Sequence, residues 1–81
     1  MSTVKGSIVK ATAGREKNCF FVVIDVDSDY AYIADGKRRK LESPKKKKFI
    51  HLQPTKTVIE SSFETNPQIR KILKKFTENG G

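Results

Sequence analysis

The 81-residue chain contains no tryptophan and only one cysteine and one histidine, and the scarcity of the last two excludes whole classes of protein. A single cysteine, Cys19, cannot form an internal disulfide. One Cys and one His cannot supply the four ligands of a structural zinc site. The scattered carboxylates show no spacing that would place a general base beside a nucleophile. The sequence therefore predicts a protein without enzymatic activity, bound metal or cofactor.

The chain also lacks a long apolar run. No stretch approaches the ~20 apolar residues that cross a bilayer, and the N-terminus does not have the pattern of a signal peptide. We therefore expect a cytoplasmic protein in a reducing compartment. Because Cys19 opens the apolar run at residues 19–24, we expect it to be a small buried hydrophobe rather than a reactive thiol.

The residues that are present favour short β-strands. Residues 4–11 and 19–26 are rich in β-branched and aromatic side chains, and residues 30–34 alternate Tyr, Ala and Ile. Gly14 and Asn18 tolerate left-handed backbone, which suits a tight turn between the first two strands. Turns rich in Asp and Gly follow the second and third. A chain of this length forms one small domain with a modest core.

Two further strands are predicted after these three. Residues 49–53 form the fourth, with Ile50 and Leu52 as its apolar anchors, and residues 57–59 form a fifth beyond Pro54. Five short strands joined by tight turns predict a mostly β fold, a small antiparallel barrel or sandwich.

The C-terminal region changes to a helical period. An N-cap at Asn66, a proline at the first helical position and a terminal Gly pair predict an amphipathic helix over residues 67–78. We therefore divide the chain into a barrel at residues 1–60 and an extension at residues 61–81. The apolar stripe of the helix is expected first to pack within the molecule, then to bind a protein partner, and least of all to lie on a membrane. It consists of Ile69, Ile72, Leu73 and Phe76.

Positive charge is concentrated in one window. Residues 37–56 contain nine basic residues and one acidic residue, so their local charge of +8 equals the net charge of the whole chain. Such crowding repels itself unless a polyanion is present, which favours nucleic acid as the partner over a merely solvated loop. The expected contacts are Lys37, Arg38, Arg39, Lys40, Lys45, Lys46, Lys47 and Lys48, with His51 expected to point away from the core beside the lysines.

Aromatic residues add a question that the sequence leaves open. Tyr30 and Tyr32 lie on the same side of their predicted strand, so both are either core residues or surface residues able to stack on bases. Phe20 poses the same alternative, and at least one of the three is expected in the core.

Several short motifs occur in an order typical of a known family. They are Gly6, the run Thr12-Ala13-Gly14-Arg15-Glu16, Phe21-Val22-Val23, Ala34-Asp35-Gly36, Arg39-Lys40-Leu41 and His51-Leu52. Over residues 4–55 the chain resembles KOW proteins, in particular those related to the archaeal and eukaryotic large-subunit ribosomal protein family fourteen and their small stand-alone bacterial relatives. Asn18 stands where that family commonly has glycine.

The resemblance implies an SH3-like five-stranded barrel that binds RNA through the KOW loop and adjacent basic loops. By position it adds Gly14, Arg15 and Lys17 to the expected RNA-binding residues. It also implies association with ribosomes and a role in translation. We therefore expect a non-enzymatic module that contacts the backbone of structured RNA, with ribosomal RNA as one candidate, and that has no membrane and no small-molecule substrate as a partner. The alternative is a protein–protein adaptor that uses the barrel or the helix stripe, since fold does not fix function.

Overall fold

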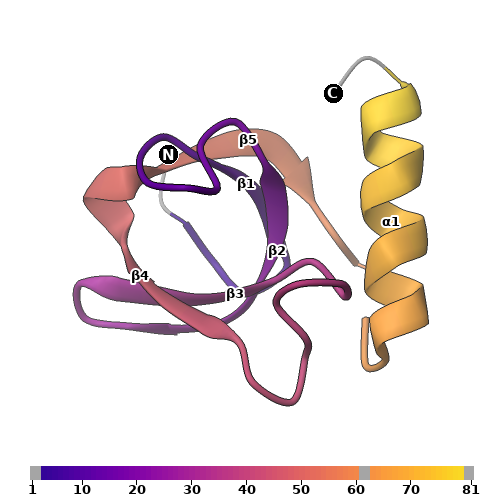
Figure 1. Cartoon of the computed structure of the whole chain (residues 1–81), viewed down its shortest axis with the longest axis horizontal. Helices are drawn as coiled ribbons and strands as arrows, with labels where there is room; N and C mark the ends of the chain where they lie inside the picture. Colours follow the sequence, from indigo (N-terminus) through magenta and orange to yellow (C-terminus); the bar gives the residue numbers. More distant parts are fainter. Residues whose placement is uncertain (1–2, 61–62, 80–81) are drawn as a thin grey trace.

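The fold is one antiparallel sheet of five strands followed by a helix. The computed structural model describes residues 3–60 and 63–79. Figure 1 shows its elements in chain order: β1 (Ser7–Ala11), β2 (Phe20–Asp27), β3 (Tyr30–Ala34), β4 (Lys45–Lys48), the short 3₁₀ helix η1 (Phe49–His51), β5 (Leu52–Val58) and α1 (Asn66–Glu78). The spatial order of the strands is β4-β3-β2-β1-β5. The predicted mostly β class with one C-terminal helix is confirmed.

The first three strands match the prediction closely. The third has the predicted bounds, and the second begins and ends one residue later than predicted. The first begins at Ser7 rather than Val4, because the Ser7 amide donates to the Val4 carbonyl and closes a turn before the strand. The left-handed backbone expected at Gly14 (φ 81°) and Asn18 (φ 73°) is confirmed.

Two further strands form as predicted, but the bounds predicted for them were wrong. The lysine run itself forms β4, paired with β3 from Tyr30 opposite Lys48 to Ile33 opposite Lys45. Residues 49–51 form η1, and β5 then runs through Pro54, which an edge strand tolerates because its outer amides need no partner. Ile50 is not an anchor, since it is 79% exposed on η1, whereas Leu52 is buried as expected.

The sheet carries a hydrophobic core on each of its two faces. One core includes Val9, Phe21 and Ile33, and the other includes Ile8 and Val22 together with the helix. Strands buried on both faces are continuously apolar rather than alternating. This double burial explains the Ile8-Val9 pair that interrupts the alternation of the first strand. Within the described residues, hydrogen bonding joins β4 only to β3 and β5 only to β1.

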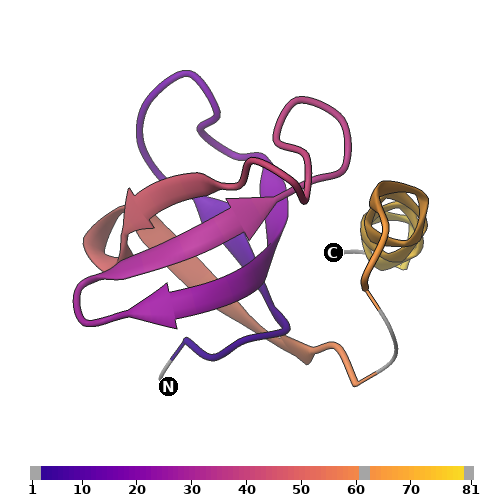
Figure 2. The ribbon, with the colours of Figure 1, turned by 90° about the horizontal axis from the view of Figure 1, so that it is seen from below.

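Helix α1 packs against the second core, beside β2 (Figure 2). Its apolar stripe faces inward: Ile69 and Leu73 are buried, and Ile72 and Phe76 are partly buried against the same cluster. The expectation that the stripe packs within the molecule is therefore confirmed. The helix shares a core with the sheet, while the division at residue 60 remains a prediction.

The start of α1 differs from the prediction by one residue. Thr65 is the N-cap, and its side chain and that of Gln68 form a reciprocal capping box. Asn66 is the first helical residue and its side chain is used elsewhere, because its Oδ1 accepts from the Leu41 amide at 2.7 Å and its Nδ2 donates to Glu42.

Cys19 is exposed, so the prediction that it is buried was wrong. It closes the β1–β2 loop, one residue before the strand begins, and its backbone carbonyl accepts from the Ala11 amide. Among the residues that the structure describes, no helix is long and apolar enough to cross a membrane.

Candidate nucleic-acid interface

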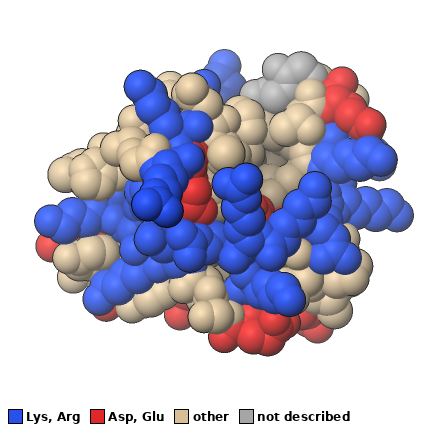
Figure 3. All heavy atoms as spheres, viewed as in Figure 1, with Lys and Arg blue, Asp and Glu red and all other residues tan. Residues whose placement is uncertain are grey.

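Three segments far apart in the sequence bring basic residues together. The β1–β2 loop (residues 12–19) and the β3–β4 loop (residues 35–44) rise on the same side of the sheet, and β4 continues from the second loop (Figure 2). Lys and Arg side chains gather over this face (Figure 3). We call their basic residues the basic rim: Arg15, Lys17, Lys37, Arg38, Arg39, Lys40, Lys45, Lys46, Lys47 and Lys48. The structure therefore brings the loop cations together with Lys45 and Lys47, whereas Lys46 and Lys48 point to the other face of β4.

The β1–β2 loop is held by its own backbone. The Lys17 amide donates to the Gly14 carbonyl and the Cys19 amide donates to the Glu16 carbonyl. Gly14 (φ 81°) allows the left-handed turn that this path needs. As a result Arg15 and Lys17 are exposed while Glu16, between them, is 7% exposed. The loop presents two cations outward and one carboxylate inward.

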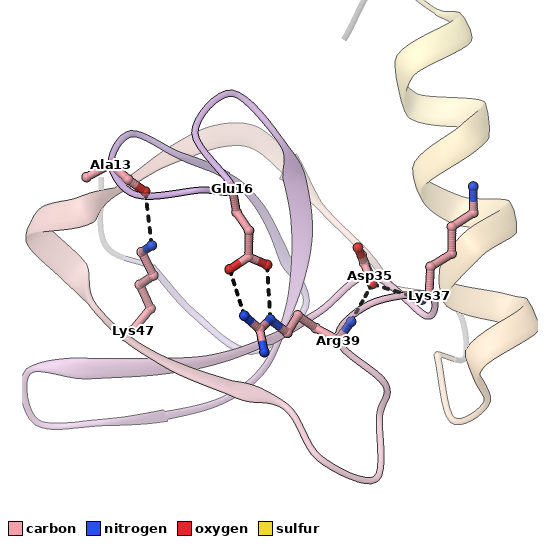
Figure 4. Close-up of polar contacts among 6 residues, drawn as sticks. All are labelled: Ala13, Glu16, Asp35, Lys37, Arg39 and Lys47. Carbon is pink, nitrogen blue, oxygen red and sulfur yellow. Dashed lines mark hydrogen bonds and ion pairs between the residues drawn. The ribbon is translucent and has the colours of Figure 1, made fainter.

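The β3–β4 loop is wound around Asp35 (Figure 4). One oxygen of its carboxylate accepts from the amides of Lys37 at 2.8 Å and Arg39 at 2.9 Å. The neighbouring Gly36 adopts φ 79°, and its carbonyl accepts a hydrogen bond from Arg70 of α1 at 2.6 Å. The loop is thus fixed from within by Asp35 and from outside by the helix, and Lys37, Arg38 and Lys40 extend from it into solvent.

Arg39 joins the two loops (Figure 4). Its Nε and one terminal nitrogen donate to the two carboxylate oxygens of Glu16, at 3.0 and 3.2 Å. These hydrogen bonds, together with the charges of Arg39, Lys45 and Lys47, lower the pKa of Glu16 against the opposing effect of burial. Arg39 is therefore a positioning residue as well as a cation, and its charge is the one in the rim that a carboxylate compensates among the described residues.

The four lysines of β4 point alternately to the two faces of the sheet. Lys45 and Lys47 lie opposite the core residues Ile33 and Ala31, and both are half-buried. Lys47 extends to the β1–β2 loop, where its Nζ donates to the Ala13 carbonyl at 3.1 Å (Figure 4). Lys46 and Lys48 are exposed on the other face.

The two tyrosines lie on that other face, so the open question is answered in favour of the surface. Tyr30 and Tyr32 are half-buried, and the Lys46 Nζ lies 4.4 Å from the centre of the Tyr30 ring. On their other side they pair with Asp27 and Asp25 of β2. Because carboxylates repel phosphate, this face, with Lys46 and Lys48, is less suited to RNA than the side that carries the two loops. Of the three aromatics, Phe20 is the one associated with a core: it is partly buried against the second core and packs edge to face on Phe76.

His51 lies at the end of η1 and is half-buried. Its carbonyl accepts from the Thr12 amide at 2.9 Å, so its backbone adjoins the start of the β1–β2 loop. The prediction that it points away from the core is met only in part, because the adjacent Ile50 takes the exposed position.

Sequence reasoning missed the parts of the site that are not basic. Glu16 and Asp35 organise the two loops, yet neither was selected as a functional residue. The available signal was position: Glu16 is the single acid in a loop with two cations, and Asp35 precedes a glycine at the start of the basic window. No cluster of three or more His, Cys, Asp or Glu that could hold a metal exists within residues 3–60 and 63–79.

The sequence matches none of the protein-family models, and none of the curated proteins, with which it was compared. The geometry of the interface itself is that of fixed loops that present uncompensated cations on one face.

Proposed function

We propose that the protein is a non-enzymatic RNA-binding module that grips the backbone of structured RNA with the basic rim. One observation carries the proposal. Of the ten cations in the rim, Arg39 alone has a carboxylate partner among the described residues, although the chain has nine acidic residues. Cations that a fold gathers without compensation favour a polyanionic partner, and phosphate contacts supply most of the affinity of such binding.

The order within the loops also supports this function. Three contacts fix the interface before any ligand arrives. Asp35 holds the backbone of the β3–β4 loop, Glu16 holds the Arg39 side chain, and the Ala13 carbonyl holds the Lys47 side chain. Binding then has fewer groups to immobilise, so less affinity is lost to ordering. The five-stranded sheet and its basic β1–β2 loop agree with the resemblance to KOW proteins, so we extend the proposal to an SH3-like KOW module, cytoplasmic and associated with ribosomal RNA.

Fluorescence polarisation of a labelled RNA hairpin tests the proposal. A rim that touches about four phosphates gives a log–log salt slope of roughly −3 to −4, so affinity falls about 60- to 250-fold between 50 and 200 mM salt. Arg15→Glu with Arg38→Glu removes one exposed cation from each of the two loops and should abolish most binding at low salt.

The matched control is Lys5→Glu with Lys56→Glu. These two lysines are exposed and lie outside the rim, and the double substitution changes the net charge by the same amount. The control should bind nearly as wild type does. Equal losses in both variants would reduce the effect to overall charge, and absence of binding at low salt would refute the proposal.

The adaptor alternative has weaker support, because the helix stripe that it would use is packed into the second core. Its remaining partly exposed members, Ile72 and Phe76, line a groove beside β5. Capture of a protein partner that survives nuclease treatment and depends on these two residues would favour it.

A further inference from the structure

A second basic surface lies beside the rim, between the loops and helix α1. A groove of about 700 Å³ runs there, within the range of ~300–1,000 Å³ typical of ligand sites. Its cations come from both sides: Lys37 from the β3–β4 loop, and Lys71 and Lys74 from the helix. Figure 4 shows the Lys37 side chain beside α1, on the side of Asp35 away from Lys47.

The groove has an apolar floor as well as cationic walls. Phe20 and Leu73 are its large apolar lining residues: Leu73 is buried in the second core and Phe20 is partly buried against that core. Its one acidic lining residue, Asp35, uses a carboxylate oxygen to hold the amides of the loop. Arg70 is likewise occupied, by the Gly36 carbonyl. That hydrogen bond does not neutralise Arg70, so the groove carries the charge of Arg70 as well as the charges of the three lysines.

We propose that this groove binds a single-stranded continuation of the RNA that the basic rim holds. The proposal rests on the proposed function. Lysines at the walls meet the phosphates, and the apolar floor takes an unstacked base, a combination typical of single-strand binding. A duplex keeps its bases stacked inside and has nothing to place on such a floor.

Positive charge continues without interruption from the rim to the groove. Lys37 belongs to both, and Figure 3 shows Lys and Arg side chains extending from the loops across to the helix. Among the described residues neither Lys71 nor Lys74 is within ion-pair distance of a carboxylate. The third lysine of this helical segment, Lys75, lines the opposite groove, beside β5. Two lysines of α1 therefore line the groove beside the loops, and the third lies outside it.

Cys19 provides a direct readout, because it is exposed, lines the groove and is the single cysteine of the chain. We expect a single-stranded RNA of roughly 12 nucleotides, inside the ~4–16 range of single-strand binding domains, to slow its modification by a thiol reagent several-fold. A blunt RNA hairpin bound to the rim should slow it much less.

Lys74→Glu and Lys75→Glu form a matched pair, being adjacent exposed residues of one helix with the same charge change. Lys74→Glu should weaken single-strand binding, lower the salt slope by roughly 0.7 and restore Cys19 reactivity, whereas Lys75→Glu should leave all three near wild type. Thermal unfolding by circular dichroism checks that both variants stay folded.

The outcomes separate the two proposals. RNA that binds at low salt while Cys19 stays as reactive as in the free protein overturns the groove and leaves the rim intact. Equal protection by the blunt hairpin, or equal effects of the two lysine substitutions, also overturns it. Absence of all RNA binding removes the proposed function, and the groove with it.

Discussion

The two basic clusters look alike in the sequence, but the fold uses them differently. The first, residues 37–40, sits on a loop fixed by Asp35 and Arg70, and one of its members forms a bidentate ion pair with Glu16. The second, β4, is held by pairing with β3, and one of its members makes a single hydrogen bond to the Ala13 carbonyl. In each cluster one cation therefore contacts the β1–β2 loop. The charge of Arg39 is neutralised by Glu16, whereas that of Lys47 is not neutralised by the Ala13 carbonyl.

Two basic residues with the same charge can therefore have different structural roles in this protein. Arg38 and Arg39 are neighbours of the same type, yet the first is exposed and the second connects two loops. Substituting a residue that holds a loop in place should therefore lower the stability of the fold, whereas substituting its exposed neighbour should not.

The largest such effect on stability is expected at Arg39. Arg39→Gln leaves the buried Glu16 carboxylate without its bidentate partner, which should cost about 1–2 kcal/mol, discounted because Arg39 is itself partly exposed. Arg38→Gln should change the free energy of unfolding by less than about 0.5 kcal/mol. Urea denaturation measures both. If the two variants are equally stable, the first cluster does not hold the loop.

A smaller, pH-dependent effect follows from the lowered pKa of Glu16. A carboxyl whose pKa is lower in the folded than in the unfolded protein stabilises the fold above its unfolded value, and this contribution is lost as pH falls through the folded pKa. The stability gap between wild type and Arg39→Gln should therefore be full at neutral pH and shrink below the ordinary glutamate pKa of 4.5. Urea denaturation at a series of acidic pH values measures the gap. A gap that stays constant would assign the effect to packing rather than charge.

The smallest effect is expected in the second cluster. Lys47→Met removes one hydrogen bond to a partly exposed carbonyl and should cost at most about 1 kcal/mol. Lys48→Met is its control, as an exposed lysine on the opposite face of the strand. Thermal unfolding should separate the two by no more than about 4–8 °C. If Lys47→Met lowers the free energy of unfolding more than Arg39→Gln does, the second cluster contributes more to stability than the first.

Much of the fold was predictable because its signals are local. Asp and Gly turns, β-branched runs and the helical period fixed three strands and the helix to within a few residues. The lysine strand was not predictable in this way, since nothing intrinsic to four lysines favours a strand, and β3 supplies the pairing that makes one. Ile50 was misassigned for the same reason: the path of η1 is set by the strands on either side of it.

The candidate site likewise has a part that was predictable from sequence and a part that was not. Charge density identified the basic residues, because charge is a property of composition. The Glu16–Arg39 pair spans 23 residues, so no local pattern predicts it. The groove beside α1 depends on where the helix packs, which the sequence left open.

The position of β4 at one border of the sheet has a consequence for solubility. An unpaired strand border is a template on which a second molecule can add its own strand, and lysines deter this by mutual repulsion. Pro54, which has no amide hydrogen, stands in β5 at the other border. Removing all four lysines at once would therefore invite self-association, and light scattering should accompany any such variant, so that a precipitating protein is not mistaken for one that has lost its ligand.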